Sequence, residues 1–237
     1  MNTTPATPPR PADMDPLALH DDVAPQIEAL TLRRGVPLIV TDCDEVLMQF
    51  LVGLETYLET QGLWLDLTSY ALTGNIKHRD TNEVFDASGM PELMKGFFAT
   101  STHALLAVPG AADALKALSG RAQIVVLTNV PFTEKETRAK SLAAQGMDYP
   151  VIANKGLKGG AVKKLAGMVE APVFFLDDIH HNIASVAKAH DASHRLHFIA
   201  DKRLAKLMGQ SPDSHFHTTE WAEAHDFIAA RLDESGH

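Results

Sequence analysis

The sequence predicts an α/β fold, in which a Rossmann-like parallel sheet carries helices on both faces and a small helical domain is inserted after the first strand. Short apolar runs alternate along the chain with amphipathic segments, which is the pattern of β-α-β units. The runs are almost wholly apolar, as expected of strands buried on both faces. No clear run occurs between Asp42 and Gln123, which indicates the insertion.

The expected strands are residues 38–40, 124–127, 151–152, 173–176 and 196–199. Helix signals lie between them. Residues 133–136 have the pattern of a capping box, and Gly146 can close the helix that it opens. Residues 160–169 place aliphatic side chains on one helical face, and residues 111–118, which precede Gly120, are similar.

The predicted domain organisation has a flexible or strapped-on arm, a core in two pieces and an insert. These are residues 1–20, residues 21–47 with 108–237, and residues 48–107, respectively. The arm is rich in proline and has little to bury. Within the insert, residues 50–61 and 91–106 have helical spacing, whereas residues 72–86 are polar and rich in turn residues.

Composition limits the compartment and the partners. The 237 residues can build a sizeable core without disulfides. Cys43 is the single cysteine and no zinc-type Cys/His spacing occurs, so a cytoplasmic location is expected. No apolar run reaches the about 18 residues of a membrane span. The net charge of −9 argues against nucleic acid polymers and membranes as partners, while small anions can still be bound locally. The sequence predicts no oligomeric state.

Two carboxylates, Asp42 and Asp44, stand two residues apart directly after the first expected strand. A carboxylate can attack phosphorus, and a second one nearby can protonate the leaving oxygen and then activate water. By itself this spacing also fits solvated turn aspartates or a simple metal site.

Three further polar features follow later strands. Thr128 and Asn129 offer a hydroxyl and backbone N–H groups for phosphate oxygens, although a turn would look the same. Lys158 leads into a helix, whose amino end also favours anions. The adjacent acids Asp177 and Asp178 repel each other, and Mg²⁺, which prefers carboxylate oxygens, would relieve that repulsion. All four features fall where an open α/β sheet forms its ligand crevice.

In this chain order the features resemble the haloacid dehalogenase superfamily, over residues 37–199. The resemblance implies that Asp42 is the nucleophile and Asp44 the general acid/base, while Thr128 and Lys158 bind the phosphoryl group. It also implies that Mg²⁺ is held by Asp42, the backbone carbonyl of Asp44, and the acid pair Asp177 and Asp178, of which Asp178 is the expected direct ligand.

The resemblance further implies that residues 48–107 are a helical cap of the C1 type, which closes over the site and selects the substrate. An acid at position 44 is typical of the phosphatases and phosphomutases of the superfamily and absent from its dehalogenases and ATPases. The implied function is a Mg²⁺-dependent phosphohydrolase acting on a small phosphomonoester. One departure is Glu45, where the superfamily commonly has glycine; it places a bulky, negative residue in a tight turn next to the site.

Other residues have weaker claims on the site. Lys155 is a rival for the role of Lys158. His180 and His181 are expected to begin a helix rather than to bind substrate, and Asn182 to support the acidic loop. The polar stretch 74–80 could recognise an anionic substrate, but a solvated loop is favoured. Four cap aromatics could line a pocket, with packing between helices favoured: Trp64, Tyr70, Phe97 and Phe98.

Three alternatives stay open at this stage. A phosphomutase of the same superfamily would use the same residues. A phosphorylation-receiver module also uses acids, a threonine and a lysine, but in a different chain order and without a large insert. A non-catalytic phosphate-binding or interaction protein could keep the fold and use the arm and insert for docking.

Overall fold

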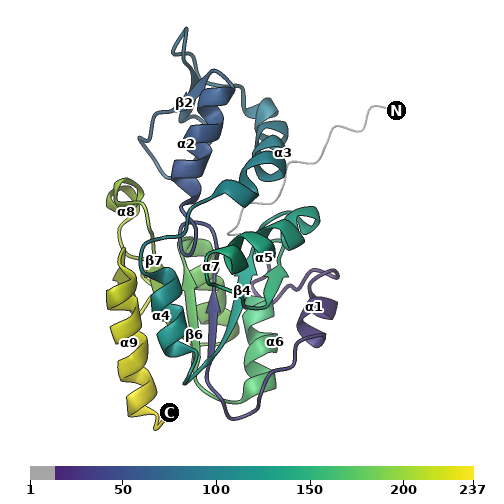
Figure 1. The fold of residues 1–237 in the computed structure, drawn as a ribbon, viewed down its shortest axis with the longest axis vertical. Coiled ribbons are helices and arrows are strands. Elements are labelled where there is room, and N and C mark those ends of the chain that lie inside the picture. The colour runs from purple at the N-terminus through teal and green to yellow at the C-terminus, as the bar shows by residue number, and fades with distance from the viewer. Residues whose placement is uncertain (1–13) are drawn as a thin grey trace.

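The computed structural model describes residues 14–237, which are built around a six-stranded sheet (Figure 1). Its strand order is β5-β4-β1-β6-β7-β8, and every neighbouring pair is parallel. The strands are β1 (Leu38–Thr41), β4 (Gln123–Thr128), β5 (Val151–Ala153), β6 (Val173–Asp177), β7 (His194–Phe198) and β8 (Phe216–Thr218). The predicted α/β fold with a parallel sheet is confirmed.

Both faces of the sheet are covered by helices. Leu38 and Val40 of β1 belong to one apolar cluster and Ile39 to the other, because successive side chains of a strand point to opposite faces. The first face packs on α1 (Ala24–Glu28), α6 (Gly159–Val169) and α7 (His180–Ala189). The second packs on α4 (Ala111–Leu118), α5 (Lys135–Ala144), α8 (Lys202–Met208) and α9 (Trp221–Glu234). Burial on both faces explains why the strands read as continuous apolar runs.

Two details of the core differ from the sequence prediction. The edge strand β8 was not predicted, because its polar residues form no apolar run. The capping box at 133–136 is not formed: a 3-10 helix (Phe132–Glu134) precedes α5, and no side chain caps that helix. Gly146 does follow α5 in a left-handed conformation, with φ 83°. Within residues 14–237, no helix combines the length and apolar character needed to cross a membrane.

Residues 50–104, between β1 and α4, form a separate group of elements at the carboxyl end of the sheet (Figure 1). It contains α2 (Phe50–Thr60), β2 (Leu63–Leu65), β3 (Ile76–His78), a 3-10 helix (Ala87–Gly89), α3 (Met90–Ser101) and a second 3-10 helix (Thr102–Ala104). β2 and β3 pair in an antiparallel hairpin. The sequence analysis did not predict this hairpin within the helical insert, because strands of three residues are too short to leave an alternating pattern.

The two chain segments that join this insert to the core run side by side. The Val108 N–H donates to the Leu47 carbonyl at 2.8 Å, and the Gln49 N–H donates to the Leu106 carbonyl at 2.9 Å. Towards the N-terminus, residues 1–13 of the predicted arm lie outside the described residues. Residues 16–18 pack their backbone against the start of α6.

Candidate active site

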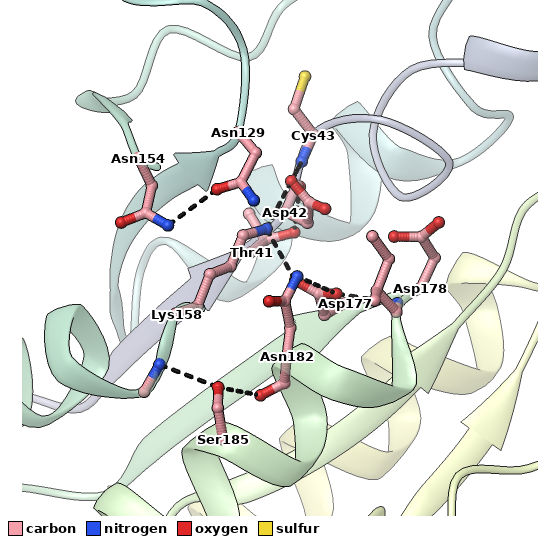
Figure 2. Close-up of polar contacts among 12 residues, drawn as sticks. Thr41, Asp42, Cys43, Asn129, Asn154, Lys158, Asp177, Asp178, Asn182 and Ser185 are labelled. Carbon is pink, nitrogen blue, oxygen red and sulfur yellow. Dashed lines mark hydrogen bonds and ion pairs between the residues drawn. The ribbon is translucent and has the colours of Figure 1, made fainter. Parts of the chain in front are cut away.

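Three neighbouring strands end at one point of the sheet, and each places a polar side chain there. Figure 2 shows two of these side chains, Asp42 and Asp177. Asp42 follows β1 directly, Asp177 is the last residue of β6, and Thr128 is the last residue of β4. The Asp42 N–H continues the ladder by donating to the Leu176 carbonyl at 2.8 Å. Since β1 lies between β4 and β6, the three side chains converge at the crevice where such sheets bind ligands.

Lys158 is a buried cation at the centre of this group. Its Nζ lies 2.8 Å from Asp42 Oδ1 and 2.7 Å from Asp177 Oδ2, and the residue has no exposed surface. Burial lowers the pKa of Lys158, but the two carboxylates outweigh burial and hold the pKa above its usual value. Gly159 allows this placement, because a Cβ there would clash with the Ser185 carbonyl oxygen of α7.

The Asp177 carboxylate is fully committed to partners in the protein. It accepts hydrogen bonds from Lys158, from Asn182 Nδ2 at 3.0 Å and from the Ile179 N–H at 2.9 Å. Burial raises the pKa of Asp177 to about 6, although Lys158 opposes the shift. The supporting role predicted for Asn182 agrees with this contact.

Asp178 has a different environment. It is buried, and its one hydrogen bond among the described side chains comes from the Tyr70 hydroxyl at 3.3 Å. Burial, and then the Asp177 and Asp42 carboxylates, raise its pKa well above the usual range. Oxygens of these three aspartates lie within 4.8 Å of one another. Three buried carboxylates beside one lysine leave excess negative charge, so the group could hold a metal ion. The Asp44 side chain is not part of it.

Asp44 instead forms an ion pair with an arginine that the sequence analysis missed. Arg138 of α5 has no exposed surface, and its Nη2 lies 2.8 Å from Asp44 Oδ1 while Nη1 donates to Cys43 Sγ at 3.4 Å. Burial raises the pKa of Asp44, and Arg138 gives the largest opposing effect. Burial also raises the pKa of Cys43, to about 12, so the thiol is protonated at neutral pH. Arg138 thus orients Asp44 from beneath.

The two residues predicted to bind phosphate, Thr128 and Asn129, differ in the hydrogen bonds of their side chains. Thr128 is buried, and its hydroxyl has no hydrogen-bond partner among residues 14–237. Asn129 Oδ1 accepts from Asn154 Nδ2 at 2.8 Å (Figure 2). Asn129 Nδ2 donates to the Gly156 carbonyl at 3.1 Å. The Thr128 hydroxyl is therefore available to a ligand. Asn154, a residue that the sequence analysis did not identify, fixes the loop beside it.

Glu45 adopts the left-handed conformation that glycine would favour, with φ 58°. Its carboxylate does not simply add charge to the site, as the sequence suggested. Oε1 accepts from the Leu51 N–H at 2.6 Å, in the first turn of α2, and Oε2 accepts from the Asp201 N–H at 2.9 Å, before α8. Burial raises the pKa of Glu45 to about 7. The side chain joins the loop after β1 to the insert and to the core.

Replacing Glu45 with glycine is expected to destabilise the protein. Glycine would relieve a left-handed conformation that costs about 1–2 kcal/mol, but it would also remove two hydrogen bonds to a charged acceptor, each contributing about 1.5–3 kcal/mol. We expect a net loss of about 2 kcal/mol in the free energy of unfolding, measured by urea denaturation. Asn82→Gly is the control, since exposed Asn82 has φ 59°. A Glu45→Gly protein as stable as the wild type would contradict this assignment.

A cavity of about 440 Å³ opens above these residues, between the sheet and the insert. Its floor and walls include Asp42, Asp44, Glu45, Thr128, Asn129 and Asp178, with Phe50, Leu51, Tyr70, Ala71, Leu72, Thr73, Met90, Phe98, Ile179 and Leu204. Tyr70 and Phe98 therefore line a pocket, as the sequence analysis considered. Phe97 is instead fully buried against Phe50, with ring centroids 5.2 Å apart.

The cations of the predicted polar stretch 74–80 have partners elsewhere. Lys77 pairs with Asp66 at 2.5 Å and lies over the Trp64 ring, and Arg79 pairs with Glu59 at 2.7 Å. None of these five side chains lines the cavity described above. The preference for an ordinary structural role over substrate binding agrees with these contacts.

A histidine that the sequence analysis missed supports the acidic loop from behind. His197 is fully buried, and it donates from Nε2 to the Asp178 carbonyl at 2.9 Å because its Nδ1 accepts the Ser211 N–H. Burial lowers its pKa to about 4, so the ring is neutral at physiological pH. His180 begins α7, as expected, and packs its ring on His197, with centroids 4.6 Å apart; His181 is exposed.

Comparison with solved structures shows which known proteins share this fold. A haloacid dehalogenase-like protein of unknown function from Agrobacterium tumefaciens superposes with a TM-score of 0.58 and 14% identity, over 83% of this chain and 99% of that one. A HAD family hydrolase from Deinococcus radiodurans, solved with bound phosphate and sodium, gives 0.56 and 18%, over 84% and 96%. A putative β-phosphoglucomutase from Thermotoga maritima gives 0.54 and 14%, over 82% and 99%.

The sequence itself matches no protein-family model and no curated protein. The relationship therefore rests on the three-dimensional arrangement, which these structures share over nearly their whole length. Residues 14–237 have the haloacid dehalogenase-like fold.

Proposed function

We propose that this protein is a Mg²⁺-dependent phosphohydrolase that cleaves a small phosphomonoester through an aspartyl-phosphate on Asp42. One observation carries the proposal: the Asp42 carboxylate stands at the end of the central strand, held at 2.8 Å by fully buried Lys158, on the floor of a cavity that is also lined by Thr128, whose buried hydroxyl has no partner among the described residues. A carboxylate, a cation and a hydroxyl donor are what a nucleophilic attack on a phosphoryl group requires.

The residues act in two steps. A carboxylate oxygen of Asp42 forms a bond to phosphorus while the ester P–O bond breaks, and the Asp44 carboxyl gives its proton to the departing alcohol. Water then loses a proton to Asp44 and attacks phosphorus, the bond to Asp42 breaks, and inorganic phosphate leaves. Burial raises the pKa of Asp44, which favours the protonated form that the first step needs. Lys158 and Thr128 stabilise the charge on the phosphoryl oxygens.

Asp42, Asp178 and the backbone carbonyl of Asp44 would hold the metal, and Asp177 would support it through its bond with Lys158. When bound, Mg²⁺ would neutralise charge on the phosphoryl oxygens and orient them for in-line attack. Carboxylate and carbonyl oxygens are the donors that this ion prefers. Residues 48–107 would act as the cap, since Tyr70 reaches Asp178 from the insert and closes one side of the cavity.

The test is phosphate release from p-nitrophenyl phosphate and a panel of phosphorylated metabolites, with Mg²⁺ and after treatment with EDTA. We expect chelation to reduce the rate at least about 100-fold, because a metal ion contributes several kcal/mol to such a transition state. Readdition of Mg²⁺ should restore it. The same rate in EDTA would contradict the metal assignment. Phosphate transfer between positions of one sugar, without release, would favour a phosphomutase.

A further inference from the structure

The cavity above Asp42 has two chemically different ends. Carboxylates and the Thr128 hydroxyl form the end at the sheet. Most of the remaining wall is aliphatic or aromatic and comes from several separate parts of the chain, with Thr73, Asn129 and the Tyr70 hydroxyl as its other polar groups. Its larger apolar side chains are Phe50 and Leu51 of α2, Leu72 of the loop between β2 and β3, Met90 and Phe98 of α3, Ile179 before α7, and Leu204 of α8. A group attached to a phosphate bound beside Asp42 would meet these side chains.

The cavity also lacks cations that could bind a second anionic group. Among the described residues that line it, none is Lys or Arg. Lys158 and Arg138 are fully buried beneath the floor, where they pair with its aspartates. Lys155 lines a second hollow, of about 530 Å³, which lies beyond Phe98 and Asn129.

Apart from Tyr70, the ionisable side chains that face the cavity are all carboxyl groups. Asp44, Glu45 and Asp178 line its wall, in addition to the proposed nucleophile. A carboxylate or second phosphate on the substrate would lose its hydration against apolar walls without gaining a cationic partner, and any of these carboxyl groups that is ionised would also repel it. An uncharged apolar group would gain from burial instead.

Resting on the hydrolase function proposed above, we propose that the substrate is a phosphomonoester of an apolar, uncharged alcohol or phenol, without a second anionic group. A volume of about 440 Å³ fits a small molecule of this kind. Phosphorylated carboxylic acids and sugar bisphosphates are accordingly poor substrates.

A series of straight-chain alkyl phosphates, from ethyl to hexyl, tests this directly. The leaving alcohols have nearly the same intrinsic reactivity, so differences in kcat/KM report contacts with the cavity. We expect kcat/KM to rise about threefold to fourfold for each added methylene until the cavity is filled. Replacing the end of the butyl chain with a carboxylate should lower kcat/KM more than about tenfold.

A charge-insertion variant gives a second readout. Leu72→Arg places a cation in the cavity wall and is expected to reverse the preference, so that the carboxylate-ended ester becomes the better substrate. Leu106→Arg is the matched control, because Leu106 is 64% exposed and does not line this cavity. The control should keep the wild-type preference.

The outcomes separate this inference from the proposed function. Mg²⁺-dependent hydrolysis of p-nitrophenyl phosphate with no dependence on chain length would overturn the substrate class and leave the hydrolase intact. A preference for the carboxylate-ended ester that is lost in Lys155→Met would also overturn it, and would assign the second hollow to the substrate. No release of phosphate from any ester would overturn both proposals.

Discussion

Asp42→Asn is expected to reduce phosphate release by about 10⁴-fold or more, because the amide oxygen cannot serve as the nucleophile that forms the covalent intermediate. The substitution keeps the size of the side chain and one oxygen near Lys158. It should therefore leave the fold intact, with Lys158 still paired to Asp177 at 2.7 Å. The rate is measured with p-nitrophenyl phosphate and butyl phosphate in Mg²⁺, at matched protein concentration.

Asp148→Asn is the control, since Asp148 is exposed and lies outside the site. Brief incubation of the wild type with ³²P-labelled substrate, followed by acid quench, should trap label on the protein, whereas Asp42→Asn should trap none. Equal rates for Asp42→Asn and the wild type would remove Asp42 as the nucleophile. Label retained by the variant would place the covalent bond on another residue.

Most of the site could be predicted because its position depends on a simple rule of the fold. The apolar runs mark the strands, and in a parallel sheet the residues after each strand meet at one edge. Asp42, Thr128 and Asp177 come together for this reason, whatever lies between them in sequence. Lys158 could be chosen over Lys155 because it begins a helix, and its Nζ does reach Asp42.

The sequence analysis missed other residues because their role depends on a partner far away in the chain. A charged residue on a helix is normally exposed, so Arg138 has no signal of its own. Only the spacing of Arg138, Ser141 and Leu142, which form the buried face of α5, could have indicated it. His197 likewise gains its role from the Asp178 carbonyl on the neighbouring strand. The β2–β3 hairpin is too short to have a readable period.

Arg138→Met is expected to lower the free energy of unfolding by about 3 kcal/mol, because it leaves the part-buried Asp44 carboxylate, whose Oδ1 atom is buried, without its ion-pair partner. Met has a similar length and no charge, so packing is largely kept. Burial already raises the pKa of Asp44 and Arg138 opposes it, so the folded variant should bind a proton at Asp44 more readily than the unfolded chain. The loss should therefore shrink as pH falls from 8 to 5, measured by urea denaturation.

Two further measurements test whether Arg138 orients Asp44 as a general acid or only forms an ion pair with it. If Arg138 holds Asp44 in place, Arg138→Met should slow butyl phosphate far more than p-nitrophenyl phosphate, because only the alkoxide needs a proton to leave. The double variant combines Arg138→Met with Asp44→Asn, and it has neither charge of the ion pair. Its loss of stability should therefore differ from the sum of the two single losses by about 1–3 kcal/mol. Arg138→Lys, which keeps a cation, should recover part of both effects. Additive stabilities together with equal slowing of the two esters would mean that Arg138 acts on neither the protonation nor the orientation of Asp44.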